Sequence, residues 1–340
     1  MIVTPGKINI RSRFPRKLKW GVAGCGNFTE TYFLPALQLV QRSKLVSVFS
    51  HDLSRAQNIA TKFGAVNSFN DFDQFLKSDI DSVYISGANI HHYEHVIKAA
   101  KSGKNILCER PIALTSIQAE EMVRVCKENN VLLITNHLHR FHPLVQKAKE
   151  LIDKQLLGKI VSISASYNLS FPPDNNFRFK KELSGGGVLR DLGSHMIDLL
   201  RYFGGEIVEV KGFMDNVVYK SEVEDYASAI VKYEQGGYGF FTVSYDSKKV
   251  SNRIDITGHN GSISIETIFA KKNTISKLVI DLNGEAKKVF RKRLNKVVFM
   301  VRAVQRAFLK NEFHDFSGQD GVANLKIIEQ LEAQCLSIKN

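Results

Sequence analysis

The sequence lacks the features that define several large classes of protein. Its 340 residues contain no run that approaches the roughly 20 consecutive apolar residues of a membrane span, so stable membrane insertion is not expected. Its first residues lack the apolar core of about 7 to 15 residues that marks a secretion signal, which predicts a cytoplasmic protein. The four cysteines include no C-x-x-C pair, so neither a zinc site nor a disulfide framework is indicated.

Acidic residues are scarce relative to basic ones. The chain has 47 Lys and Arg against 34 Asp and Glu, a formal net charge of +13 with histidine neutral. The excess is confined to two segments, because residues 1–19 carry +6, residues 271–310 carry +10, and the rest of the chain sums to −3. Nothing else indicates a nucleic-acid-binding fold, so no nucleic-acid partner is expected. An anionic substrate, or a salt-sensitive contact with a charged surface, is left open.

The order of apolar patterns predicts two domains of different architecture. Between about Lys17 and His142, short β-branched runs alternate with longer amphipathic stretches, which is typical of β-α-β units and a parallel sheet. Beyond this point, turn signals separate alternating strands, as antiparallel connections require, and the last expected strand is Ser262–Glu266. We predict an α/β protein with a basic amino-terminal extension (1–18), a doubly wound parallel-sheet domain (19–142), and an α+β domain with an open, mainly antiparallel sheet for substrate binding and oligomerisation (143–340).

A glycine-containing turn follows the first expected strand, Leu18–Ala23. Gly24 and Gly26 permit a tight turn and the close approach of a pyrophosphate, and the helix that follows from Asn27 presents free backbone N–H groups. The third glycine of the G-x-G-x-x-G template is replaced by Thr29. Because the turn opens a β-α-β unit, it predicts a binding site for a dinucleotide.

The end of the second expected strand bears on the choice between NAD and NADP. An acidic residue normally ends this strand and binds the adenosine ribose of NAD, but Ser50 occupies the position here, with His51 and Arg55 nearby. A hydroxyl with basic neighbours would accept a 2′-phosphate, so we favour NADP over NAD. A shift of two residues would instead put Asp52 in the acidic position, and this alternative stays open.

Asp191 and His195 form a third candidate site, on the glycine-rich turn and expected helix Gly185–Phe203. A spacing of four residues on a helix puts two side chains on one face. A carboxylate beside an imidazole orients the ring and raises its basicity, which suits proton transfer near neutral pH. The alternative is a capping or structural pair.

Four motifs, taken in order, resemble those of the Gfo/Idh/MocA family of NAD(P)-dependent oxidoreductases, which act mostly on sugars, cyclitols and nucleotide-linked sugars. The motifs are Gly24-Cys25-Gly26-Asn27, Ala88-Asn89 with His92, Gly103 to Pro111, and Gly185 to His195. The resemblance implies a Rossmann domain followed by a sheet domain whose outer face commonly forms a dimer. A homodimer or homotetramer is therefore expected.

The resemblance also implies roles for single residues. The expected cofactor contacts, besides the glycine turn, are Phe28, Asn89, His92 and Glu109. The expected substrate contacts are Arg140, Tyr167 and Arg178. Asp191 and His195 match the family's catalytic D-x-x-x-H pair.

One departure from the family pattern concerns the chemistry. The family's E-K-P is Glu109-Arg110-Pro111 here, and arginine stays protonated where lysine can shift its pKa and share in proton transfer. Arg110 would then stabilise an oxyanion, while His195, oriented by Asp191, serves as general acid or base. Two alternatives stay open: a cofactor-binding regulator without catalysis, and an enzyme that cleaves or epimerises a glycoside by transient oxidation.

Neither the histidines nor the cysteines indicate a further reactive centre. His91 and His95, and then His137, His139 and His142, form two clusters, but no carboxylate or cysteine spacing completes a metal site. No metal is therefore expected. Cys25 and Cys108 lie inside cofactor motifs, so a catalytic thiol is not expected either.

Overall fold

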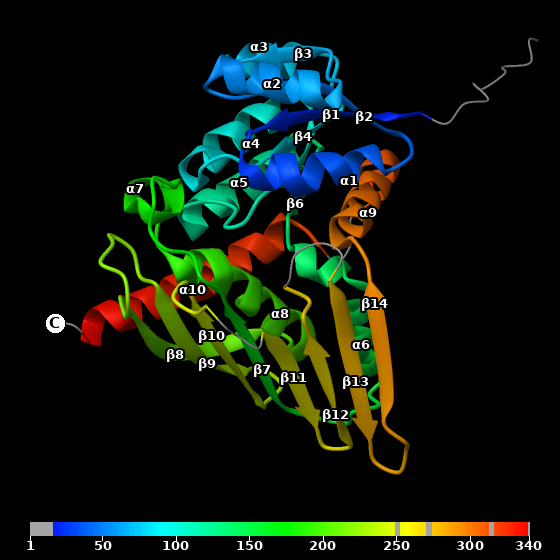
Figure 1. Ribbon diagram of the computed structural model, residues 1–340, viewed down its shortest axis with the longest axis vertical. Coiled ribbons are helices and arrows are strands. Elements are labelled where there is room, and N and C mark those ends of the chain that lie inside the picture. The colour runs from blue at the N-terminus through cyan, green and yellow to red at the C-terminus, as the bar shows by residue number, and fades with distance from the viewer. Residues whose placement is uncertain (1–15, 249–251, 270–273, 313–315, 339–340) are drawn as a thin grey trace, which may run out of the picture.

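The computed structural model describes residues 16–248, 252–269, 274–312 and 316–338. The expected basic extension, residues 1–18, therefore lies almost entirely outside the described residues. Two sheets organise the chain, and Figure 1 shows them one above the other with helices around and between them. Within the described ranges, no helix is long and apolar enough to cross a membrane.

The first sheet has six parallel strands in the order β3-β2-β1-β4-β5-β6. Side chains such as Val22, Val83 and Ile106 are fully buried in its central strands, which is why these segments consist mostly of apolar residues. The strand order reverses between β1 and β4, and ligands bind beyond the carboxyl ends of the strands at such a point. The strands are β1 (Leu18–Ala23), β2 (Ser43–Phe49), β3 (Asn67–Phe69), β4 (Ser82–Ile85), β5 (Asn105–Cys108) and β6 (Leu133–Thr135).

Helices cover both faces of this sheet. Along β4, Tyr84 belongs to one cluster of buried apolar side chains and its neighbours Val83 and Ile85 to another, as the alternation of a strand requires. The first cluster includes α1 and α2, and the second includes α3, α4 and α5. The helical segments are η1 (Thr29–Phe33), α1 (Leu34–Gln38), α2 (Leu53–Phe63), α3 (Phe72–Lys77), η2 (Asn89–His91), α4 (His92–Lys101), α5 (Ser116–Glu128) and η3 (Leu138–Phe141).

The second sheet has eight strands in the order β14-β13-β12-β11-β7-β10-β9-β8. Strands β7 and β10 are parallel, and the other described pairs are antiparallel. One face packs against helices α6 and α8, and the other is exposed. The elements are α6 (Pro143–Asp153), β7 (Ile160–Asn168), η4 (Phe177–Phe179), α7 (Lys181–Ser184), η5 (Leu189–Gly193), α8 (Ser194–Gly204), β8 (Ile207–Asp215), β9 (Tyr226–Tyr233), β10 (Tyr238–Ser244), β11 (Arg253–Gly258), β12 (Gly261–Glu266), β13 (Ile275–Leu282) and β14 (Lys288–Arg293).

The last two helices, α9 (Lys296–Lys310) and α10 (Gly318–Ile338), return to the first domain. Val301 and Val304 of α9 share a buried cluster with Trp20 of β1, and Figure 1 shows α9 beside α1. Leu325 of α10 packs in the cluster that contains Met122 of α5. The carboxyl-terminal part of the chain thus completes the core of the cofactor domain as well as forming its own.

The predicted fold class, a Rossmann sheet followed by a mainly antiparallel sheet domain, is confirmed. Two details differ. The expected helix Gly185–Phe203 is divided, because a π-helical turn, η5, precedes α8. Strands β13 and β14 follow the last expected strand, and all six residues of β14 are exposed, so no apolar alternation marks it in the sequence.

Candidate active site

The glycine turn after β1 forms an open cradle for a pyrophosphate. Gly24 has φ +115°, and a Cβ there would lie 2.8 Å from the backbone nitrogen of Gly87, so the position requires glycine. A Cβ on Gly26 would meet nothing within 4 Å, which leaves space above the first helical turn, beginning at Asn27. The turn therefore fits a dinucleotide cofactor.

The end of β2 holds the residues expected near the adenosine ribose. Asp52 is the N-cap of α2, and its Oδ1 accepts hydrogen bonds from Ser54 N (2.9 Å), Ser54 Oγ (2.6 Å) and Arg55 N (3.4 Å). This carboxylate is thus engaged locally by the helix it caps. Ser50 precedes it, and the His51 ring lies beside the His91 ring with centroids 4.8 Å apart.

Three of the expected cofactor contacts are held by protein groups at the strand ends. Asn89 Nδ2 donates to Ser184 O (2.9 Å). The His92 Nδ1 lies 2.9 Å from Pro111 O and its Nε2 3.2 Å from Gly87 O, while burial lowers the pKa of His92 to about 4. Glu109 Oε1 accepts from Tyr84 OH and from Asn136 Nδ2, each at 2.6 Å. These contacts brace the loops that follow β4 and β5.

Asp191 anchors a cluster of cations and a phenol. Its Oδ1 accepts from Arg110 Nη1, which also donates to the Asp191 backbone oxygen (3.1 Å). Its Oδ2 accepts from Arg178 Nε (3.2 Å) and from Tyr245 OH (2.6 Å). Burial alone would raise the pKa of Asp191, but the charges of Arg110 and Arg178 outweigh burial and lower it. Asp191 therefore remains a carboxylate that fixes the Arg110 guanidinium.

His195 is buried and makes none of the described contacts with Asp191. The π-helical turn Leu189–Gly193 accounts for the difference from the expected shared face, since residues four apart no longer align as they do on an α-helix. The His195 ring instead packs edge-to-face on His139, with centroids 4.6 Å apart. Burial and then the charge of Arg110 lower the pKa of His195 well below its usual range, so the imidazole is neutral.

A cavity of about 920 Å³ joins the cofactor turn to the second domain. Phe28 lines it from the cofactor side, and Tyr167, a predicted substrate contact, lines it from β7 and stacks on Phe269 (centroids 4.6 Å apart). The ionisable side chains that line it include Arg110, His139, His142, His195 and Lys296. In the sequence, His139 is one of the cluster of three histidines between residues 137 and 142, and Lys296 is one of the basic residues of segment 271–310. Neither position by itself indicated a place in the cavity.

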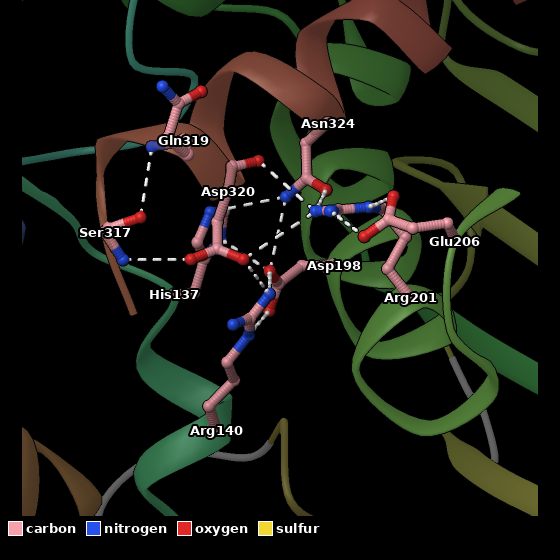
Figure 2. A network of polar contacts seen from close by, with 9 residues as sticks. All are labelled: His137, Arg140, Asp198, Arg201, Glu206, Ser317, Gln319, Asp320 and Asn324. Atoms are coloured by element: carbon pink, nitrogen blue, oxygen red, sulfur yellow. Dashed lines mark hydrogen bonds and ion pairs between the residues drawn. The ribbon is translucent and has the colours of Figure 1, made fainter. Parts of the chain in front are cut away.

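Arg140 lies elsewhere than expected. It is buried, and its guanidinium donates to Asp198 (2.6 and 3.0 Å) and to Asp320 (3.0 Å) rather than lining the cavity. Figure 2 shows these residues with His137 and Asn324, joining η3 to α8 and α10. The two carboxylates neutralise the charge of the arginine. Because they belong to α8 and α10, the ion pairs of Arg140 connect the two domains. Arg178 is bound to Asp191 and lines a small adjacent cavity.

The Rossmann sheet, the glycine turn at its switch point and the cavity beyond it define an oxidoreductase that uses a dinucleotide. Among the described residues, no cluster of three or more His, Cys, Asp or Glu side chains could hold a metal ion. Two family models match the chain: an oxidoreductase family with an NAD-binding Rossmann fold over residues 18–137, and the Gfo/Idh/MocA C-terminal domain over residues 145–264. The chain belongs to the Gfo/Idh/MocA family and is an NAD(P)-dependent oxidoreductase.

Similar proteins support this assignment. Oxidoreductase P35 of Formosa agariphila is 28% identical over 270 residues, which cover 77% of this chain and 83% of the relative. A 3-ketoreductase from Actinomadura kijaniata, solved with NADP and TDP-benzene, has a TM-score of 0.82 at 22% identity over 94% of this chain and 98% of that chain. Levoglucosan dehydrogenase, solved with NADH and levoglucosan, has a TM-score of 0.86 at 20% identity over 95% and 98%. At these identities the two structures show the shared fold.

Proposed function

We propose that the chain transfers a hydride between the nicotinamide of NAD(P) and a hydroxyl or keto carbon of a sugar, cyclitol or nucleotide sugar. The observation that carries this proposal is one cavity lined both by Phe28, beside the cofactor turn, and by Arg110 and His195. The names of the two similar solved proteins, a 3-ketoreductase and a levoglucosan dehydrogenase, support a sugar-like substrate.

The proposed roles follow from the contacts of each residue. Gly24, Gly26 and Asn27 would hold the pyrophosphate, and the bound nicotinamide supplies the hydride chemistry. Arg110, held by Asp191, keeps a permanent positive charge beside the cavity and stabilises negative charge on the substrate oxygen. His195, a neutral imidazole, hydrogen-bonds the reacting hydroxyl and passes its proton.

We propose NADP as the preferred cofactor. The one acidic side chain near the end of β2 that could bind a ribose, Asp52, is engaged in capping α2. Ser50, His51 and Arg55 then remain to contact the 2′ position, and a hydroxyl with two basic groups favours a phosphate there.

We propose that the substrate carries an anionic group. Arg110 and Lys248 line the cavity, and Arg110 shares the single Asp191 carboxylate with Arg178, so positive charge remains there. Glu266, the described carboxylate that lines the cavity, lies 3.4 Å from Lys277 Nζ and is neutralised. An anionic substituent such as the diphosphate of a nucleotide sugar would therefore enter a cavity of opposite charge.

The exposed face of the second sheet is the proposed dimer interface. Phe240 of β10 lies directly opposite Ile230 of β9, and Phe213 of β8 pairs with Ser228. The side chains of Phe213, Ile230 and Phe240 are all exposed in the single chain. Covering this apolar face with a second copy would remove it from water.

Replacing His195 tests the proposed chemistry. We expect His195→Ala to lower kcat/KM on a keto-sugar substrate by about 100-fold or more, because a proton-transfer group contributes about 10² to 10⁴. The Kd for NADPH should stay unchanged. His259→Ala, an exposed histidine in the turn between β11 and β12, is the control and should retain wild-type turnover. Wild-type turnover by His195→Ala with intact cofactor binding would refute the role.

A further inference from the structure

Lys296 brings an amine into the active-site cavity from the second domain. It is the first residue of α9, after the N-cap Asn295, whose side chain accepts from Val297 N (3.1 Å). Lys296 lines the cavity, and its Nζ donates to the backbone oxygen of Ile268 and lies 3.5 Å from His139 Nδ1. A neutral amine can donate one N–H to the Ile268 oxygen while its lone pair faces His139 Nδ1, from which it can accept a proton.

The surroundings of Lys296 disfavour its charged form. The titratable and charged side chains that line the cavity with it are Tyr32, Arg110, His139, His142, Tyr167, His195, Lys248 and Glu266. Glu266 is paired with Lys277, and among the described residues Lys296 forms no ion pair. The Lys296 residue is half-buried, and protein atoms surround its amine closely. This burial removes water from the ammonium form and lowers the pKa of Lys296 to about 7, because no described carboxylate pairs with it.

Arg110 and the three histidines that line the cavity with Lys296 do not titrate near neutral pH. Arg110 stays protonated. Burial lowers the pKa of His142 to about 4 and those of His139 and His195 well below their usual range. His195 can therefore transfer a proton but does not remain protonated near neutral pH. The proton that leaves the substrate must pass on to another acceptor.

We propose that the Lys296 amine is the final acceptor of the substrate proton and receives it from His195 through His139. The proposal rests on the hydride transfer put forward under Proposed function. The contacts place His139 between the two groups, since its Nδ1 lies 3.5 Å from the Lys296 amine and its ring packs edge-to-face on the His195 ring, with centroids 4.6 Å apart. Transfer of the proton from His195 to His139 is part of the proposal. Lys296 is thus a proton-accepting residue that acts through two histidines.

In the oxidation direction, the substrate C–H bond would break and its electron pair would leave with the hydrogen as hydride to bound NAD(P)⁺, while the O–H bond breaks and a C=O bond forms. The proton enters the His195 imidazole at one nitrogen as another leaves it for His139, and His139 likewise passes one to the Lys296 amine, which becomes an ammonium. In reduction the same ammonium returns the proton to the developing alkoxide.

The pH dependence of turnover tests the proposal. In the wild type, oxidation should rise with pH up to about 7 and level off above it, because the amine must be neutral. Lys296→Ala should lose about 100-fold in kcat, the scale of a proton-transfer group, and lose this inflection. Added ethylamine should restore activity to Lys296→Ala, which a merely structural role would not allow. Lys310→Ala, at the exposed end of the same helix, is the control and should keep the wild-type profile.

A second measurement does not depend on turnover. In cofactor-free protein, the rate at which acetic anhydride labels Lys296, followed by mass spectrometry, should show a midpoint near pH 7. A free lysine derivative labelled in the same solution, whose side-chain pKa is about 10.4, serves as the reference. Labelling of Lys296 with an ordinary lysine pKa, or an unchanged pH profile in active Lys296→Ala, would overturn the proposal. An inactive wild type with a Lys296 that titrates near pH 7 would instead refute the proposed function alone.

Discussion

Three aspartates of this chain illustrate how contacts decide what a residue does. Asp52 caps a helix on the surface, Asp191 fixes an arginine beside the cavity, and Asp198 neutralises a buried arginine between domains. All three are ionised, but only Asp191 acts on a group that lines the cavity. A carboxylate at a plausible sequence position is therefore insufficient to assign a role.

At the scale of single residues, the proposed preference for NADP over NAD can be tested. Ser50→Glu should raise the Kd for NADPH by about tenfold or more, about 1.4 kcal/mol, because a carboxylate would repel the 2′-phosphate. The Kd for NADH should fall or stay unchanged. Asp52→Asn is the matched control, since it weakens the cap of α2 but leaves Ser50, His51 and Arg55 in place. Fluorescence titration of both variants measures the ratio of the Kd for NADPH to the Kd for NADH. Tighter NADPH binding by Ser50→Glu than by the wild type would contradict the preference for NADP.

The sequence predicted some of the site residues and missed others for a physical reason. Gly24 and Gly26 could be predicted because strand, turn and helix are consecutive in the chain. The exposure of Lys296 to the cavity depends on contacts with Ile268 and with His139, which is 157 residues away. No local pattern encodes such a contact, so Lys296 was indistinguishable from the basic residues around it.

At the scale of elements, the π-helical turn η5 and the segment η3 place side chains where α-helical spacing would not. η5 separates Asp191 from His195, and η3 directs His139 to the cavity and Arg140 to the interdomain network. The sequence pattern predicted a helix around η5 but none at η3, and it could not show that η5 is π-helical. η5 packs against β7, β9 and β10, and η3 packs against α8 and α9, so both depend on segments that are distant in the sequence.

The interdomain network of Figure 2 gives a prediction of stability. Asp198→Asn should lower the free energy of unfolding by about 3 to 5 kcal/mol, because the buried Arg140 would lose its bidentate partner. Glu206→Gln should cost less than about 1 kcal/mol, since Glu206 pairs with Arg201 at the surface and its side chain is 61% exposed. Urea-induced unfolding compares the two. Equal losses would show that Arg140 does not depend on Asp198.

At the scale of the whole molecule, the alternation of strands and helices sufficed to predict two sheet domains in the correct order. It did not indicate that α9 and α10 return to the Rossmann core, since an amphipathic helix shows that it packs on an apolar surface but not on which one. These helices are far from the first domain in the sequence, so the sequence pattern did not show that they pack on its core.

The exposed sheet face gives a prediction of assembly. If the proposed dimer forms through this face, the double variant Phe240→Asp with Ile230→Asp should be a monomer, because the new carboxylates would be buried in the interface without partners. Ile117→Asp, on the exposed surface of α5, should leave the assembly unchanged. Light scattering after size-exclusion chromatography measures the mass. A dimeric double variant would locate the interface elsewhere.

Hydride transfer itself is tested most directly by an isotope. Wild-type protein is incubated with a panel of keto sugars and nucleotide keto sugars and with NADPH carrying deuterium at the nicotinamide C4, and the products are analysed by mass spectrometry. We predict an alcohol with one deuterium on the former carbonyl carbon and an equal amount of NADP⁺. Tight NADPH binding without deuterium transfer to any member of the panel, or a cleaved or epimerised product without net NADP⁺, would contradict it.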